Sequence, residues 1–155
     1  MSERVKGAMF NVIGDIEDYT VLDAFAGTGA LGFEALSRGA SNVTFIERDR
    51  VAQKVIMENA GVLRAEGDIK LIKASVAAWD DTAEDGGYDL IFADPPYNDV
   101  QFSTVSRLFR HLKPNGLMIL SLPGRESAPT VNGVVVVDNR SYGDAALAFY
   151  RRDAA

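Results

Sequence analysis

The residues best suited to chemistry form the stretch "DPPY", which follows a strand-like run over residues 88–93. Pro95 and Pro96 lack a backbone N–H and hold φ near about −65°, so they end the strand in a stiff turn. Beside a methyl donor, the Asp94 carboxylate and the Pro95 carbonyl would accept both N–H bonds of an exocyclic base amine, while Tyr97 stacks on the base. We therefore predict a catalytic site for an unpaired or flipped nucleobase, without a metal. The alternative is a loop with a stacking tyrosine and no chemistry.

A glycine-rich loop at the end of an earlier apolar run predicts where a cofactor binds. The stretch "DAFAGTGALG" begins at Asp23 and contains Gly27, Gly29 and Gly32, which let the backbone turn sharply beside a ligand. The spacing matches the G-x-G-x-x-G fingerprint, so a nicotinamide or flavin enzyme is one interpretation. Asp23 would repel a pyrophosphate but attract the ammonium group of S-adenosylmethionine, which favours the latter cofactor. A glycine turn that only packs a helix on a strand is a third interpretation.

The ends of the next two strand-like runs supply residues for the rest of the cofactor. Glu47 ends the second run and is expected to bind ribose hydroxyls. Arg48 follows it and is expected beside the adenine. After the third run, over residues 69–73, Ser75 and Val76 are expected to offer a polar group and a backbone amide to the adenine edge.

Alternating apolar patterns predict the elements that position these residues. The spacing predicts a first helix over 3–13, with Ser2 as its N-cap and Gly14 as its stop. Strand and helix patterns then alternate, which is typical of a parallel sheet built from right-handed crossovers. The predicted strands are 20–25, 42–47, 69–73, 88–93 and 117–123, and the predicted helices are 30–39, 50–63 and 102–112.

The end of the chain differs from this alternation. Runs 133–139 and 146–152 have no helix between them and predict a C-terminal antiparallel β-hairpin. An acidic loop is expected over 80–87, and a tight turn over 113–116. We predict a three-layer α/β fold, Rossmann-like and doubly wound, with a mostly parallel sheet.

Size and composition limit the class of protein. The 155 residues contain no linker-like segment, so we expect one domain with an N-terminal helix over 1–14 and a catalytic core over 20–155. Without cysteine and with one histidine, the chain has no thiolate or His-cluster metal site. A net charge of −6 argues against non-specific electrostatic binding of nucleic acid. No signal peptide or membrane-spanning run is recognised, so we expect a cytoplasmic monomer.

Three stretches resemble the RsmD-type ribosomal RNA methyltransferases. These class I S-adenosylmethionine-dependent enzymes methylate the exocyclic N2 amine of a guanine in 16S ribosomal RNA. The stretches are "VLDAFAGTGALGFEALSRGASNVTFIERD", "DLIFADPPY" and "YGDAALAFYRR", and the opening "SERVKGAMFNVIG" resembles the segment before the family's core. The resemblance covers essentially the whole chain. Its first stretch is specific to this group, whereas the D-P-P-Y tetrad is shared by amino methyltransferases acting on DNA, RNA and protein glutamine.

The resemblance implies a role for each matching residue. It implies that Glu47 binds the ribose hydroxyls, that Arg48 flanks the adenine, and that the stretch 94–97 holds the target guanine. The implied partner is ribosomal RNA or a small-subunit assembly particle, and the implied cofactor is S-adenosyl-L-methionine. The residues implied around the methionine part of the cofactor are Asp23, Phe25, Gly27, Thr28 and Gly29.

Three departures from the family pattern are the start of the chain, Ser75 and a pI that is low for a ribosome-directed enzyme. The first concerns RNA affinity and substrate choice more than the chemistry, and the second concerns the adenine contact. Family members usually begin with a basic β-hairpin segment before "S-x-R-V", where this chain starts. Ser75 stands where the family often has Asp or Asn. If the protein naturally lacks the basic segment, the main candidates for phosphate contact are Arg107, Arg110 and His111, on the helix after the proline turn. The alternative for these three residues is a solvated helix face.

Other functions stay open from the sequence. A DNA adenine-N6 or cytosine-N4 methyltransferase shares the tetrad, although 155 residues leave no room for a target-recognition domain. A nicotinamide dehydrogenase is favoured by the glycine spacing alone. A ribosome-assembly factor would bind the cofactor and methylate nothing.

Overall fold

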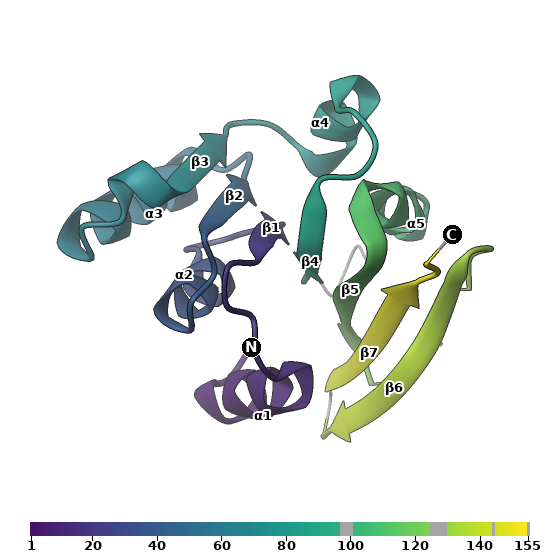
Figure 1. Cartoon of the computed structure of the whole chain (residues 1–155). Helices are drawn as coiled ribbons and strands as arrows, with labels where there is room; N and C mark the ends of the chain where they lie inside the picture. The colour runs from purple at the N-terminus through teal and green to yellow at the C-terminus, as the bar shows by residue number, and fades with distance from the viewer. Residues whose placement is uncertain (97–100, 125–129, 144, 155) are drawn as a thin grey trace.

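A seven-stranded sheet forms the centre of the computed structural model, which describes residues 1–96, 101–124, 130–143 and 145–154. The strand order is β3-β2-β1-β4-β5-β7-β6 (Figure 1). The strands from β3 to β5 are parallel, whereas β7 pairs antiparallel with both β5 and β6. This arrangement confirms the predicted fold class, including the C-terminal hairpin. The strands are β1 (Thr20–Ala24), β2 (Asn42–Ile46), β3 (Ile69–Ile72), β4 (Tyr88–Ala93), β5 (Leu112–Pro123), β6 (Val134–Tyr142) and β7 (Ala145–Arg152).

Helices cover both faces of the sheet, so the fold has three layers (Figure 1). One core lies between the sheet and α1, α2 and α3, and the other lies between the sheet and α4, α5 and η2. Successive residues of β4 serve the two cores in turn: Leu90 and Phe92 face the first, and Ile91 and Ala93 face the second. The helices are α1 (Glu3–Ile13), α2 (Ala30–Ser37), α3 (Arg50–Val62), α4 (Val76–Thr82) and α5 (Phe102–Leu108), with 3₁₀ turns η1 (Glu66–Asp68) and η2 (Phe109–His111).

The first helix follows directly from its local sequence. The Ser2 hydroxyl accepts a hydrogen bond from the Val5 N–H at 3.2 Å, and Gly14 ends the helix with φ 80°. Met9 and Phe10 are buried, so one face of the helix packs on the sheet. The predicted bounds and caps of this helix are confirmed. No helix in the described part of the chain is long and apolar enough to cross a membrane.

The sequence analysis does not predict the fourth helix, α4. The first three residues of the predicted acidic loop, 80–82, belong to α4. A helix of 7 residues is too short to be stable alone, so its pattern carries little signal and its stability comes from tertiary contacts. Val76 and Asp80 are its buried residues.

The predicted turn over 113–116 lies inside a strand. Tyr88 pairs with Leu112 and Leu90 pairs with Leu117, so β5 carries extra residues that form a bulge opposite β4. Asn115 takes φ 66° within this bulge. Turn-forming residues therefore bend a continuous strand here and do not end it.

Candidate active site

A cavity of about 250 Å³ lies at the carboxyl ends of the parallel strands. Its walls come from the connections that follow β1, β2, β3 and β4, the place where open parallel sheets bind ligands. The structure thus brings most of the predicted cofactor residues and two residues of the proline turn to one cavity. The predicted residues that line it are Phe25, Gly27, Glu47, Arg48, Ser75, Val76, Asp94 and Pro96, and the other lining residues are Ile46, Ala74 and Gln101.

A second hollow, of about 330 Å³, adjoins the first toward the N-terminal helix. Asp94 lines both hollows, as do two residues of the glycine loop. The remaining predicted residues are placed as follows: Asp23 and Thr28 line the second hollow, Gly29 precedes α2, Pro95 is buried, and Tyr97 lies outside the described residues.

Left-handed backbone conformations give the glycine loop its shape. Gly27 has φ 59° and Gly29 has φ 86°, values that glycine adopts without steric cost. Phe25 has φ 55°, which costs a bulky residue about 1–3 kcal/mol. This strained residue lines both hollows, as expected where function requires the conformation.

The third glycine of the loop serves helix packing. A Cβ at Gly32 would lie 2.3 Å from Cε1 of Phe45 in β2, so only glycine lets α2 approach the sheet this closely. The Gly32 N–H donates to the Asp23 carboxylate at 3.0 Å. Packing therefore also fixes the orientation of that carboxylate.

The Glu47 carboxylate is held in place by backbone N–H groups from two loops. Its Oε1 accepts from Gly27 at 2.8 Å, and its Oε2 accepts from Asp49 at 2.8 Å. Each carboxylate oxygen has a second acceptor site, so a pair of ribose hydroxyls can still bind. The Glu47 carboxylate is thus fixed in an orientation that suits hydrogen bonding to a diol.

The other two carboxylates of the site suit a cationic ligand. Burial raises the pKa of Asp23 well above its usual value; the Gly32 hydrogen bond lowers it, while the nearby charges of Asp94 and Glu47 raise it further. Burial also raises the pKa of Asp94, although the charge of the terminal amine and a hydrogen bond with Ser121 oppose this shift. A sulfonium and an ammonium group would favour the ionised forms of both carboxylates. These two carboxylates therefore fit S-adenosylmethionine.

The start of α4 forms the wall of the cavity that the sequence predicts to face the adenine. The Ser75 hydroxyl caps this helix by accepting from the Ala78 N–H at 3.1 Å, and its proton is still available to an acceptor. Val76 follows as the first helical residue and Arg48 is exposed at the rim. Gln101, which precedes α5, lines the same cavity although its sequence context carries no recognisable signal.

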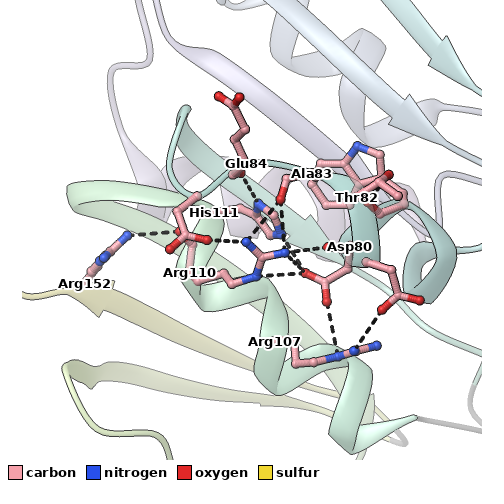
Figure 2. A network of polar contacts seen from close by, with 11 residues as sticks. Asp80, Thr82, Ala83, Glu84, Arg107, Arg110, His111 and Arg152 are labelled. Carbon is pink, nitrogen blue, oxygen red and sulfur yellow. Dashed lines mark hydrogen bonds and ion pairs between the residues drawn. The ribbon is translucent and has the colours of Figure 1, made fainter.

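The basic residues after the proline turn do not form a solvated face. Figure 2 shows Arg107, Arg110 and His111 gathered around Asp80 of α4. His111 has no exposed surface, so the structure corrects the prediction that it contacts a phosphate. Arg110 is paired with both Asp80 and Asp85, which neutralises its charge locally. Phosphate contact by Arg107, whose side chain is 46% exposed, stays a prediction.

Comparison with known proteins adds family relationships to this geometry. A family model described as Conserved hypothetical protein 95 matches residues 1–151. Ribosomal RNA small subunit methyltransferase D of Haemophilus influenzae is 28% identical over 155 residues, which is 96% of this chain and 80% of that protein. The Escherichia coli K12 protein of the same name is 37% identical over 98 residues, 62% of this chain and 48% of its own length. A solved structure of a conserved hypothetical protein from Streptococcus pyogenes is 30% identical, with a TM-score of 0.88 and coverage of 96% of this chain and 95% of that chain.

Proposed function

The chain belongs to the family of RsmD-type ribosomal RNA methyltransferases, and on this premise we propose that it methylates the exocyclic N2 amine of a guanine in small-subunit ribosomal RNA. The cofactor is S-adenosyl-L-methionine. When bound, it supplies an electrophilic methyl group on a positively charged sulfur. The observation that carries the proposal is the position of Asp94, which lines both hollows at the end of β4.

The proline turn accounts for the choice of an amine. The Asp94 carboxylate accepts one N–H of the guanine amine, and the Pro95 carbonyl accepts the other. These two acceptors hold the nitrogen in line with the methyl carbon, which supplies most of the rate enhancement by positioning. With the cofactor bound, the methyl group would pass from sulfur to the amine nitrogen, the sulfur would keep the electron pair of the broken bond, and the amine would release one proton. Asp94 is suited to take that proton because burial raises its pKa.

The remaining residues bind and orient the cofactor. Glu47 holds the ribose hydroxyls, with both of its oxygens fixed by the backbone. Asp23 attracts the ammonium group of the methionine part, beside Gly27 and Thr28. Arg48, Ser75 and Val76 surround the adenine, and this assignment rests on their place in the cavity wall.

The experiment that tests this proposal is transfer of labelled methyl groups to small ribosomal subunits from a strain that lacks its own guanine-N2 enzyme. Protein-free ribosomal RNA is used in parallel, and the product is identified by nucleoside analysis. N2-methylguanosine on either substrate supports the proposal and shows what the enzyme recognises. Methylated adenosine would show a different target base. Cofactor binding without transfer to either substrate would favour the inactive assembly factor.

A further inference from the structure

The polar network in Figure 2 has a buried carboxylate at its centre. Asp80, in the last turn of α4, is 3% exposed. Its Oδ1 lies 2.7 Å from Nε2 of His111 and 2.9 Å from Nη2 of Arg110, and its Oδ2 lies 3.2 Å from Nε of Arg107. Three side chains from α5 and η2 therefore occupy both oxygens of one carboxylate on α4.

The partners of this carboxylate keep it ionised. Burial favours the neutral form of Asp80, but the hydrogen bond from His111 and the charges of Arg110 and Arg107 outweigh it, so the pKa of Asp80 is lowered overall. The other ring nitrogen of His111, Nδ1, lies 3.1 Å from the Glu84 carbonyl oxygen. Both ring nitrogens of His111 therefore lie beside oxygen atoms of the network. The network therefore joins two helices through paired charges.

The position of α4 depends on this connection. A carboxylate in the last turn of a helix is unfavourable with respect to the helix dipole, so Asp80 does not stabilise α4 by itself. The ring centroids of Trp79 and His111 are 4.4 Å apart, which adds a packing contact at the same end of the helix. Arg110 also donates to the Asp80 and Ala83 carbonyl oxygens, near the end of the helix. The carboxyl-terminal end of α4 is thus attached to α5 and η2.

The opposite ends of both helices reach the cofactor cavity. Ser75 and Val76, at the start of α4, line its adenine side. Gln101, directly before α5, lines the same cavity together with Asp94 and Pro96 of the proline turn. The 7 residues of α4 span about 10 Å, so Asp80 and the cavity wall lie at opposite ends of one short helix.

We propose that Asp80 is a positioning residue for the cofactor cavity. By tying α4 to α5 and η2 through Arg107, Arg110 and His111, it sets the separation between the adenine wall and the proline turn, and so determines cofactor affinity. This inference rests on the proposed placement of the cofactor adenine beside Ser75. It assigns a role in binding to residues that do not themselves contact the ligand.

The test compares Asp80→Asn with Asp81→Asn. Asparagine keeps the shape of the Asp80 side chain but removes the charge and turns an NH₂ group toward a donor. We expect the dissociation constant for S-adenosylhomocysteine, measured by isothermal titration calorimetry without RNA, to increase about tenfold in Asp80→Asn. Asp81 is the matched control because it is the next residue, its side chain is 66% exposed and it contacts the network at Arg107, on its rim. Its variant should stay within about twofold of the wild type.

Unfolding in urea, measured on the same samples, separates positioning from folding. If Asp80→Asn lowers stability while folded samples keep the wild-type affinity, the carboxylate is only structural and the proposal is wrong. If that variant does not fold, Arg107→Gln decides, because its side chain is half exposed and its removal leaves Arg110 and His111 in place. A loss of affinity of about threefold in Arg107→Gln supports the proposal, and wild-type affinity overturns it.

The same titrations distinguish this proposal from the proposed function. Because they contain no RNA, their outcome does not depend on which base is methylated. Failure of the wild-type protein to bind S-adenosylhomocysteine would refute the cofactor assignment, and with it the positioning role. Normal binding with no transfer to any ribosomal substrate would refute only the guanine assignment.

Discussion

The substitution Glu47→Gln tests whether the cavity binds the cofactor through a preorganised acceptor. In the native protein, the two carboxylate oxygens accept from different backbone N–H groups, those of Gly27 and Asp49, each at 2.8 Å. Glutamine has the same shape but only one oxygen. Whichever way its amide turns, an NH₂ group faces one of these two N–H groups.

The structure sets the size of the expected effect. A hydrogen bond to a charged group contributes about 1.5–3 kcal/mol, and Glu47 is only partly buried, so we expect the free energy of unfolding to fall by about 1–2 kcal/mol. The ribose hydroxyls lose a charged acceptor at the same time. We expect the dissociation constant for S-adenosylhomocysteine to increase about tenfold to thirtyfold.

Calorimetric titration and urea unfolding measure these two quantities on the same protein. Glu58→Gln is the matched control, because Glu58 is exposed on α3 and the substitution is chemically identical. It should leave both quantities unchanged. A Glu47→Gln protein that is less stable but binds the cofactor normally would show that Glu47 only connects two loops. Unchanged stability would refute the role of the two backbone contacts.

Three further predictions address catalysis, packing and pH. Asp94→Asn should lower the rate of methyl transfer by about 100-fold or more, while the affinity for S-adenosylhomocysteine, which lacks the sulfonium charge, stays within about threefold of the wild type; an equal loss of both would make Asp94 a cofactor ligand. Gly32→Ala should lower the free energy of unfolding in urea by about 1–3 kcal/mol, because the new Cβ would lie 2.3 Å from the Phe45 ring. The control Gly61→Ala, which has open space around it in α3, should raise that free energy by up to about 1 kcal/mol. Similar values for both variants would contradict the packing argument. Because burial raises the pKa of Asp23, this carboxylate binds a proton more readily in the folded ligand-free protein than in the unfolded chain. The contribution of Asp23 to stability therefore falls as pH rises from about 4 through the raised pKa. Over the same range, affinity for the cationic cofactor should increase in calorimetric titrations, and Asp23→Asn should remove that dependence.

The surroundings of the basic residues restrict where RNA phosphates bind. Asp80, Asp81 and Asp85 lie against Arg107 and Arg110, so this part of the surface carries no excess of positive charge. Arg48 differs because it is exposed at the rim of the cofactor cavity. We therefore expect little electrostatic attraction of RNA at this part of the surface.

The local sequence determined those elements that depend only on contacts between residues close together in the chain. Ser2 and Gly14 delimit α1 because a cap requires only nearby backbone groups. That the glycine loop and the acid after β2 lie at one cavity was predictable because parallel strands bring their carboxyl ends to one edge. The fold class follows from the same alternation of strand and helix.

Tertiary structure alone decided the features that depend on residues far apart in the sequence. The helix α4 is too short to be recognised from its own pattern, and its last turn is held by Arg110, which lies 30 residues beyond Asp80. Arg107, Arg110 and His111 have the composition of a phosphate-binding face, but their environment is a buried carboxylate. Charge along a sequence shows which groups are present. Whether such a group meets solvent, a ligand or a counter-charge is decided by packing, because long-range contacts determine its neighbours and its dielectric environment.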